Sequence, residues 1–442
     1  MRMFGTDGVR GIANTELTPE IALALGRAAV TVLASSRSPV VFVGRDTRRS
    51  GDLLVAALAA GCMSAGADVV DLGVVPTPAL AYLTRCHHAS VGAMVSASHN
   101  PAIDNGIKFF SQDGYKLPDE VEDAIEATIR NGGALSVAGD RVGVLRQEAA
   151  LQEDYLAYLK RVVPVDLTGL KIVVDAANGA AFALAPALFT ALGATVIPLN
   201  VSPDGLNINV DAGSTHPRLM VDTVRAESAH LGLAFDGDAD RLIACDSQGR
   251  LVDGDNVLHI CASSLQANGL LPQATVVGTV MSNLGLDAVL RRKDIKVRRA
   301  QVGDRYVLAE MQKSGAVLGG EQSGHCIFLA SSTTGDGLLT ALMLLQTVVE
   351  QGIPLDAWLD EFRRYPQVLL NIAVSDKHGT MKQSAVREAI MWAEDTLGET
   401  GRILVRPSGT EACVRVMVEA PDEAMANLTA EAVAATIRSA SA

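Results

Sequence analysis

The sequence has no excess of positive charge. Lys and Arg number 37 against 50 Asp and Glu, which gives a net charge of −13. General binding to nucleic acid needs a basic face that displaces counterions, so this class of partner is not expected. A small anionic ligand stays compatible with the composition, because a local group of arginines can oppose the overall charge.

Zinc-type cysteine pairs and long apolar runs are missing as well. The six cysteines, at positions 62, 86, 245, 261, 326 and 413, include no Cys-x-x-Cys pair. This distribution suits a reducing compartment and fits neither a zinc site nor a small disulfide framework. The first residues, MRMFGTDGVRG, lack the apolar core of a signal peptide, and the apolar stretch 21–34 is interrupted by Arg27 and too short for a bilayer. We therefore expect a cytoplasmic protein without a membrane partner.

A repeat runs through the first three quarters of the chain. At 442 residues with 48% hydrophobic side chains, the sequence is long enough for about three domains, or four smaller ones, with real cores. Three times it gives a β-branched strand, a polar or glycine turn, a helix of small apolar residues and a second strand, within 40–73, 172–200 and 275–301. Strands that alternate with helices predict mostly parallel sheets covered by helices.

Each copy of the repeat adds a third apolar strand that ends in a polar loop and returns through another apolar run. These loops contain SASHNP, DGDADR and GEQSGH, so equivalent positions carry Ser98, then three aspartates, then Glu321. Ligands of parallel α/β sheets bind beyond the carboxyl ends of the strands. If the domains pack around one crevice, the three loops can line it together. For SASHNP alone, the other interpretation is a tight turn.

The last segment, 366–442, breaks the pattern and predicts a small α+β domain: a strand, a helix at 382–396, two strands joined by a loop, and a final helix. A further helix at 150–163 separates the first and second repeats. We predict three similar mixed-sheet α/β domains at 1–150, 151–255 and 256–365, followed by the α+β domain at 366–442.

The alternate aspartates of DGDADR, Asp236, Asp238 and Asp240, repel one another unless a cation lies among them. Hard carboxylate oxygens suit Mg²⁺. An EF-hand is excluded, because Arg241 and Ser247 stand where that loop needs Gly and Glu. The alternative is a solvated acidic turn.

Three other segments carry candidate ligand groups. RPSGTEACVR (406–415) offers two arginines and a glycine that lets backbone N–H groups approach an anion, although a Pro-Gly hairpin turn is the alternative. In GGEQSGH, Glu321 and Ser323 suit sugar hydroxyls and His325 suits proton transfer, unless the segment is simply a tight turn. Glycine-bounded loops also carry Arg10, Arg45 and Arg48. These arginines are either anion ligands or solvated surface charges.

FGTDGVRG, SASHNP with NGIKFF, DGDADR, GEQSGH and RPSGTE follow one another at domain-scale spacing. This series resembles the α-D-phosphohexomutase superfamily across essentially the whole chain. Within it the sequence is most similar to the bacterial phosphoglucosamine mutase family, on the Gln of GEQSGH, the short segment before FGTDG and NINVDAGSTHP (207–217). The resemblance implies four domains around a central cleft, the first three with one α/β topology.

The resemblance also implies roles for single residues. Ser98 would be carried as phosphoserine, and the three aspartates would hold Mg²⁺ together with a phosphoserine oxygen. Lys108, Arg10 and His325 match positions that serve proton transfer and electrostatic support. The implied substrate-binding residues are Glu321 and Ser323 in the sugar-binding loop, and Arg406, Ser408, Gly409, Thr410 and Arg415 in the phosphate-binding loop.

The implied activity is the interconversion of glucosamine 6-phosphate and glucosamine 1-phosphate, which feeds the synthesis of UDP-N-acetylglucosamine and cell-wall precursors. Glucosamine 1,6-bisphosphate would be both intermediate and activator. The alternatives are a phosphomannomutase/phosphoglucomutase of the same superfamily, a metal-dependent phosphohydrolase, and a silent sugar-phosphate binder. The expected partner is a small sugar phosphate. The sequence leaves open whether the chain forms a homodimer.

Overall fold

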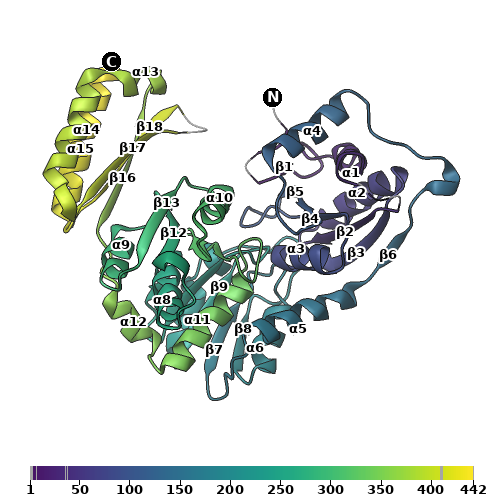
Figure 1. The fold of residues 1–442 in the computed structure, drawn as a ribbon, viewed down its shortest axis with the longest axis horizontal. Helices are drawn as coiled ribbons and strands as arrows, with labels where there is room; N and C mark the ends of the chain where they lie inside the picture. The colour runs from purple at the N-terminus through teal and green to yellow at the C-terminus, as the bar shows by residue number, and fades with distance from the viewer. Residues whose placement is uncertain (1–2, 6, 35, 37, 409–411, 442) are drawn as a thin grey trace. The chain divides into compact units, whose positions relative to one another are not determined.

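The computed structural model describes residues 3–441 except 6, 35, 37 and 409–411 (Figure 1). Internal contacts divide the chain into two units. The first unit contains Met1–Met281 and Ile295–Leu359, and the second contains Ser282–Asp294 and Asp360–Ala442.

The three predicted repeats form three sheets with one strand order. In each sheet the first strand lies between the second and the third and runs parallel to both, while the return strand pairs antiparallel with the third. The first sheet uses β2 (Val40–Arg45), β3 (Asp68–Val74), β4 (Val91–Val95) and β5 (Asp104–Ser111). The second uses β7 (Lys171–Asp175), β8 (Thr195–Leu199), β9 (Leu231–Phe235) and β10 (Leu242–Asp246). The third uses β12 (Thr275–Thr279), β13 (Lys296–Ala300), β14 (Leu318–Gly320) and β15 (Cys326–Phe328).

Short strands extend two of these sheets. β1 (Val9–Ile12) pairs antiparallel with β5, β6 (Leu145–Gln147) runs parallel to β3, and β11 (Leu251–Val252) pairs antiparallel with β10. The predicted α/β class with mixed sheets is therefore confirmed.

The helices of the first repeat are α1 (Pro19–Leu33), α2 (Gly51–Ser64), α3 (Thr77–Cys86) and α4 (Asp119–Arg130). Figure 1 shows α1 and α2 on one face of the first sheet and α3 on the other. The small residues predicted for this region let α1 and α2 pack closely. A methyl group at Gly26 would lie 2.3 Å from the Leu58 carbonyl oxygen, and one at Gly61 would lie 2.1 Å from that of Leu23.

The other helices of the first unit are α5 (Gln152–Val162), α6 (Leu184–Ala191), α7 (Arg218–Ala226), α8 (Gly254–Ala267), α10 (Asp304–Ser314) and α11 (Gly337–Gln351). α5 is the helix that the sequence predicts between the first two repeats. Among the described residues, no single helix is long and apolar enough to cross a membrane, and α11 passes that test only as a bent pair with α12 (Leu355–Glu361).

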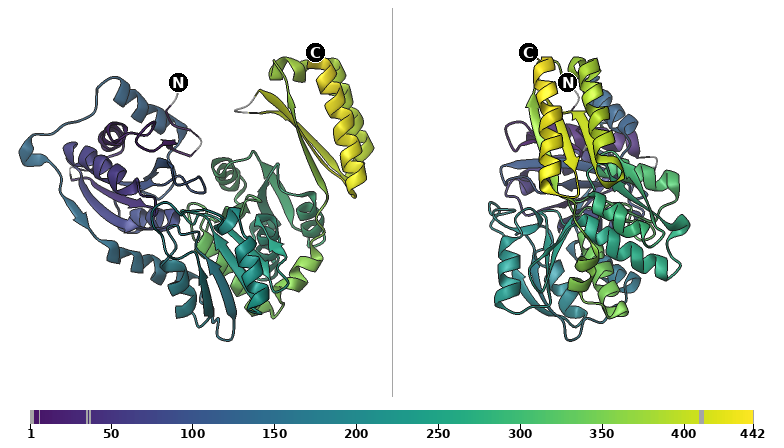
Figure 2. Two further views of the ribbon diagram at one scale, coloured as in Figure 1. Left: turned by 180° about the vertical axis from the view of Figure 1, so that it is seen from behind. Right: turned by 90° about the vertical axis from the view of Figure 1, so that its left-hand side faces the viewer.

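The second unit contains a three-stranded antiparallel sheet, in the order β16 (Gln367–Ala373), β18 (Cys413–Glu419), β17 (Arg402–Pro407). Figure 2 shows α14 (Ser384–Leu397) and α15 (Glu423–Ser441) on one face of this sheet, as expected for the α+β domain. The short helix α13 (Lys377–Lys382) is an addition to the prediction.

Helix α9 (Leu284–Arg291) also belongs to the second unit, although the sequence places it in the third repeat. The buried Glu419 carboxylate accepts hydrogen bonds from the Leu284 N–H at 3.0 Å and from the Asn283 side chain at 3.2 Å. Arg402 Nε donates to the same carboxylate at 2.6 Å. A buried carboxylate therefore joins the start of α9 to the C-terminal sheet.

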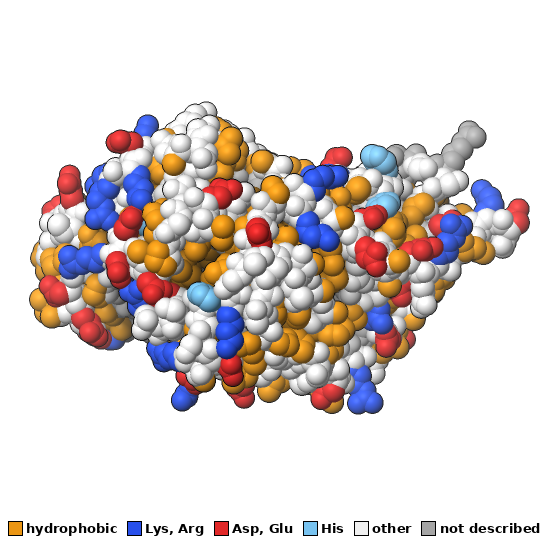
Figure 3. Space-filling view, turned by 90° about the horizontal axis from the view of Figure 1, so that it is seen from below, with side chains coloured by type: hydrophobic (Ala, Val, Ile, Leu, Met, Phe, Trp, Pro, Cys, Tyr) orange, Lys and Arg blue, Asp and Glu red, His pale blue; other side chains and the backbone are white. Residues whose placement is uncertain are grey.

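Charges of both signs are mixed on the surface drawn in Figure 3. Lys and Arg side chains lie among Asp and Glu side chains there, and the described residues on that face form no single basic patch.

Candidate active site

Ser98 lies in the loop between β4 and β5. Its backbone is left-handed, with φ of 51°, and its side chain is buried. A serine adopts this conformation at a cost, so the surroundings must hold it there.

Arg48 holds the loop. Its guanidinium is fully buried, and its Nε donates to Asp46 at 2.9 Å. It also donates to four loop carbonyl oxygens, those of Ser98 (2.9 Å), Asn100 (2.8 Å), Asp104 (3.0 Å) and Pro101. Arg48 is therefore neither a solvated charge nor free to bind an anion. Arg45 is partly exposed and pairs with Asp52 at 2.6 Å.

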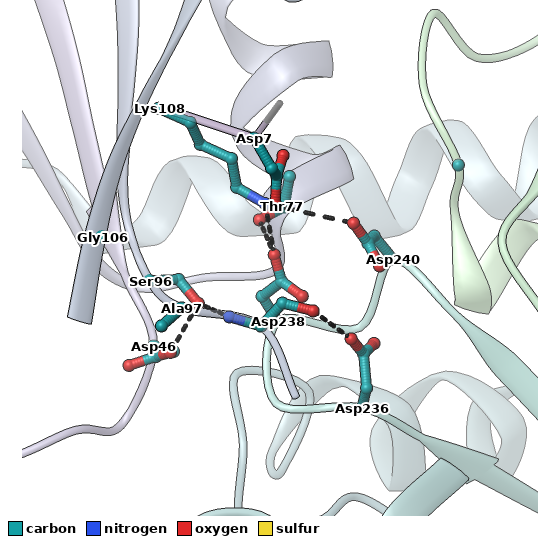
Figure 4. A network of polar contacts seen from close by, with 12 residues as sticks. Asp7, Asp46, Thr77, Ser96, Ala97, Gly106, Lys108, Asp236, Asp238 and Asp240 are labelled. Carbon is teal, nitrogen blue, oxygen red and sulfur yellow. Dashed lines mark hydrogen bonds and ion pairs between the residues drawn. The ribbon is translucent and has the colours of Figure 1, made fainter. Parts of the chain in front are cut away.

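The two serines of the loop have different surroundings. The Ser96 hydroxyl donates to Asp46 at 2.5 Å (Figure 4). Its oxygen accepts the Ser98 N–H at 3.0 Å. The Ser98 hydroxyl instead donates to Asp236 at 2.7 Å. Ser98 thus faces the aspartate loop of the second repeat, while Ser96 is engaged inside the first domain.

Gly237 allows the two loops to approach. A methyl group at this position would lie 2.5 Å from the Ser98 carbonyl oxygen, which is closer than van der Waals contact permits. The serine loop and the aspartate loop therefore contact each other through backbone.

The three aspartates form one buried cluster, in which one carboxylate oxygen of each lies within 4.8 Å of the others. Burial, together with the Asp240 and Asp238 carboxylates, raises the pKa of Asp236 well above its ordinary value. The buried Oδ1 atoms of Asp238 and Asp240 have no hydrogen-bond partner. Within the described part of the chain, this is the only group of three or more His, Cys, Asp or Glu residues that could hold a metal ion. The three carboxylates, with two oxygens that accept no hydrogen bond, fit a hard divalent cation.

Lys108, on β5, reaches the same cluster. Its Nζ lies 2.6 Å from Asp238 Oδ2 and 4.0 Å from Asp240 Oδ2 (Figure 4). Burial lowers the pKa of Lys108, but the Asp238 and Asp7 carboxylates outweigh burial and raise it, so the amine is charged. Thr77, at the start of α3, also donates to Asp238 Oδ2, at 2.6 Å.

The third loop, between β14 and β15, meets the aspartates through His325. Its Nδ1 lies 3.5 Å from Asp240 Oδ1, and the Leu242 N–H donates to the Gly324 carbonyl at 3.1 Å. Burial lowers the pKa of His325, and the neighbouring Asp240 carboxylate raises it above the ordinary value. Glu321 accepts the Gly303 N–H at 2.8 Å, whereas Ser323 is exposed.

A cavity of about 610 Å³ lies beside these loops in the first unit. The residues predicted from the sequence that line it are Arg10, Ser98, Asp240, Glu321 and His325. The structure thus brings together the three equivalent loops, as the repeat predicted. Lys108, Asp236 and Asp238 contact this group of residues without lining the cavity, and Ser323 is not among the lining residues.

The cavity is also lined by charged residues that were not predicted from the sequence, namely Asp7, Lys116, Asp119, Arg241, Asp304 and Arg305. Lys116 Nζ donates to Asp7 at 2.5 Å and to Asp304. For one of these residues, Asp304, the repeat pattern offered a clue, because an equivalent position of the first repeat holds Thr77. Asp304 begins α10 and Thr77 begins α3, and both helices follow the second strand of their repeat. Comparison of the copies at that position would have found both residues.

In the second unit, Arg406 on β17 lies directly opposite Arg415 on β18. Opposed residues of an antiparallel pair point to the same face, so the two guanidinium groups share one face of the sheet. Ser408 is buried, and its N–H donates to the Cys413 carbonyl at 2.9 Å. Gly409 and Thr410 lie outside the described residues.

Family models match four successive parts of the chain. They are the phosphoglucomutase/phosphomannomutase alpha/beta/alpha domains I (residues 1–135), II (153–249) and III (253–365), and the C-terminal domain of the same family (369–436).

Individual relatives agree with the family models. A phosphoglucosamine mutase from Symbiobacterium thermophilum is 54% identical over 443 aligned residues, which cover 99% of each chain. A solved phosphoglucomutase/phosphomannomutase family protein from Burkholderia thailandensis has a TM-score of 0.83 and 26% identity, covering 99% of this chain and 97% of its own. The fold is also that of Aspergillus fumigatus N-acetylphosphoglucosamine mutase, solved with GlcNAc-6P and magnesium, with a TM-score of 0.68, 17% identity and coverage of 100% and 96%. The chain therefore belongs to the phosphoglucomutase/phosphomannomutase family and is an isomerase with the activity of the phosphoglucosamine mutases in it.

Proposed function

We propose that Ser98 carries the phosphoryl group in the interconversion of glucosamine 6-phosphate and glucosamine 1-phosphate. One observation carries this assignment: the Ser98 hydroxyl lies 2.7 Å from Asp236, in a buried carboxylate cluster beside a cavity of about 610 Å³. Ser96, the other serine of the loop, is engaged with Asp46.

The proposed reaction is a double transfer. The bond between phosphorus and Ser98 Oγ breaks and a bond from phosphorus to the free O1 or O6 of the sugar forms. A base takes the proton of that sugar hydroxyl, and Ser98 Oγ takes up a proton as it leaves. The resulting glucosamine 1,6-bisphosphate turns end over end and returns its other phosphoryl group to Ser98. The bisphosphate is therefore both intermediate and activator.

Cationic groups would stabilise the transfer, since phosphoryl transfer depends mainly on positioning and charge neutralisation. Lys108 is charged and buried against Asp238, and Arg10 lines the cavity with its buried Nε free of hydrogen bonds. We assign both to electrostatic support. His325, which also lines the cavity, is the proposed group for moving the hydroxyl proton.

Asp236, Asp238 and Asp240 are the proposed Mg²⁺ ligands, together with a phosphoserine oxygen. Their hard oxygens, and the two Oδ1 atoms of Asp238 and Asp240 that accept no hydrogen bond, support this assignment. When bound, the ion would neutralise charge on the phosphoryl oxygens. The fungal relative described above was solved with magnesium.

Two further groups of residues are proposed to bind the substrate. Glu321 and Ser323 would contact sugar hydroxyls, and the loop of the second unit would contact the non-reacting phosphate. The shared face of Arg406 and Arg415 supports this phosphate site, because two guanidinium forks match phosphate oxygens. The remaining proposed phosphate contacts are Ser408, Gly409 and Thr410.

The test of the carrier is a pair of serine variants. Ser98→Ala should abolish turnover without unfolding the chain, and intact-mass and peptide mass spectrometry of the wild type should place one phosphate on Ser98. Ser96→Ala, the matched control, loses only hydrogen bonds to Asp46 and to the Ser98 N–H and should keep the phosphate on Ser98. A phosphate that maps to Ser96 would overturn the assignment.

The same preparation separates the proposed substrate from the alternatives. Glucosamine, glucose and mannose 6-phosphates are compared side by side with the matching bisphosphate. The highest kcat/KM is expected for the glucosamine compound. Bisphosphate-independent release of inorganic phosphate would instead indicate a phosphohydrolase.

A further inference from the structure

The segment NINVDAGSTHP (207–217) of the second repeat contains an asparagine that contacts the Ser98 loop. Asn209 has a left-handed backbone, with φ of 60°, and its side chain is buried. Its Nδ2 donates to the carbonyl oxygen of Ser98 at 2.9 Å and to that of Asn100 at 3.2 Å. Both carbonyls belong to the loop between β4 and β5, so this side chain joins two repeats across about 110 residues of sequence.

Arg48, from the first repeat, donates to the same two carbonyl oxygens. Its Nη2 lies 2.9 Å from the Ser98 oxygen and 2.8 Å from the Asn100 oxygen. Each carbonyl therefore accepts one hydrogen bond from the first repeat and one from the second, which uses both lone pairs of its oxygen. The Ser98 loop is held from two sides, by Arg48 and by Asn209.

The two acceptors determine the orientation of the Asn209 amide. A reversed amide would place Oδ1 against two carbonyl oxygens with no proton between them. As it stands, Oδ1 is buried and accepts no hydrogen bond from the described residues. A buried carbonyl without a donor costs free energy. The side chain thus directs its hydrogen bonds to the Ser98 loop, although its own oxygen is left unsatisfied.

The backbone around Asn209 is attached to the strands that lead into the aspartate loop. The Asn209 N–H donates to the Ala177 carbonyl at 2.9 Å, and the Gly213 N–H donates to Asp175, the buried last residue of β7, at 3.0 Å. A methyl group at Gly213 would lie 2.2 Å from the carbonyl oxygen of Phe235, the last residue of β9. Asn209 is therefore held by the same part of the second sheet that positions the aspartates.

We propose that Asn209 is a positioning residue that fixes Ser98 relative to the aspartate loop. The Ser98 hydroxyl lies 2.7 Å from Asp236, and this distance depends on contacts between two repeats. Asn209 supplies two hydrogen bonds of that kind, from a segment attached to the strand that precedes Asp236.

This inference rests on the proposed role of Ser98 as the phosphoryl carrier. Transfer between a fixed oxygen and a bound sugar depends on accurate placement of the reacting atoms. Loss of the Asn209 bonds should therefore lower kcat. It should leave the KM for sugar phosphate nearly unchanged, because Asn209 is not among the described residues that line the cavity.

The experiment compares two substitutions of Asn209 with the same two at Asn14, in the full chain with Mg²⁺. Asp and Gly both tolerate a left-handed backbone, so neither adds backbone strain. Asn209→Asp sets a carboxylate against two carbonyl oxygens and should lower kcat on the order of 100-fold. Asn209→Gly only removes the donor and should lower kcat about tenfold. Asn14 has φ of 61° and is exposed, so Asn14→Asp and Asn14→Gly should match the wild type.

The direct readout is amide hydrogen exchange in peptides that cover residues 96–104, measured by mass spectrometry. The Asn100 and Asp104 N–H groups donate within this loop, at 3.1 Å each. We expect faster exchange there in both Asn209 variants, wild-type exchange in both Asn14 variants, and unchanged exchange of α1 and α2 in all four.

Unchanged exchange of the loop in Asn209→Asp would overturn the inference, and so would faster exchange with the kcat of the wild type. Faster exchange throughout the first unit would also overturn it, because Asn209 would then have a general structural role. Faster exchange confined to the loop, in a protein whose phosphate maps to a residue other than Ser98, would refute the proposed function and still support the anchoring by Asn209.

Discussion

Arg48 is a buried charge whose partners are mostly backbone carbonyls of one loop. Its planar guanidinium donates to four carbonyl oxygens and to Asp46, and this set of bonds keeps Ser98 in its left-handed conformation. A lysine would keep the charge but offers three donors from a single nitrogen, which cannot reach all these acceptors.

We therefore expect Arg48→Lys to lower the free energy of unfolding by about 2–3 kcal/mol and kcat by about tenfold. The matched control is Arg45→Lys, because Arg45 is partly exposed and pairs with an exposed Asp52. That change should stay within about 0.5 kcal/mol. Urea unfolding and steady-state kinetics of both variants measure the difference, and equal effects would show that the loop does not depend on Arg48.

Asp238 is the residue on which the metal proposal can be tested most simply. Asp238→Asn removes one charge and one hard ligand from the cluster, so activation should require a higher Mg²⁺ concentration, by about tenfold or more. Excess chelator should stop turnover of the wild type. Full activity of the wild type in chelator would contradict the metal site.

At the scale of elements, the site is a contact between equivalent loops of successive repeats. Gly237 is the point of closest approach, 2.5 Å from the Ser98 carbonyl oxygen for an added methyl group. We expect Gly237→Ala to separate the two loops and to lower kcat on the order of 100-fold. Gly139→Ala, where an added methyl group meets nothing within 4 Å, is the control and should behave as the wild type. Steady-state kinetics of the two alanine variants measure this difference in kcat, and equal kcat values would contradict the prediction.

At the scale of the whole molecule, the proposed phosphoryl carrier, Ser98, would have to serve both directions of the reaction. If the loop of the second unit holds the non-reacting phosphate in each, Arg406→Ala should raise KM for glucosamine 6-phosphate and glucosamine 1-phosphate by similar factors, about 10- to 100-fold. Glu321→Ala should affect the two directions unequally, since the sugar hydroxyls change place when the sugar turns. Paired forward and reverse Michaelis curves test this, and a defect of Arg406→Ala in one direction only would require separate phosphate sites.

The sequence by itself determined the repeated units and their loops. Continuous β-branched runs and small-residue helices have a local cause in strand and helix preferences, and their threefold recurrence predicted that the loops with Ser98, the aspartates and Glu321 are equivalent. The shared strand order of the three sheets confirms that equivalence. The segment 366–442 was predictable for the same reason, because its pattern differs from that of the repeats.

Only the tertiary structure decided which side chains meet. The sequence left Arg48 open between a surface charge and an anion ligand, and its burial follows from carbonyls that the folded loop presents. Lys116 binds Asp7, about 110 residues before it, and Asp304, about 190 residues after it. No local sequence pattern predicts these contacts. Tyr155 likewise donates to Asp336, which lies about 180 residues away along the chain. Local preferences fix elements and their order, whereas contacts between distant residues depend on how the domains pack, which the pattern of any single segment does not contain.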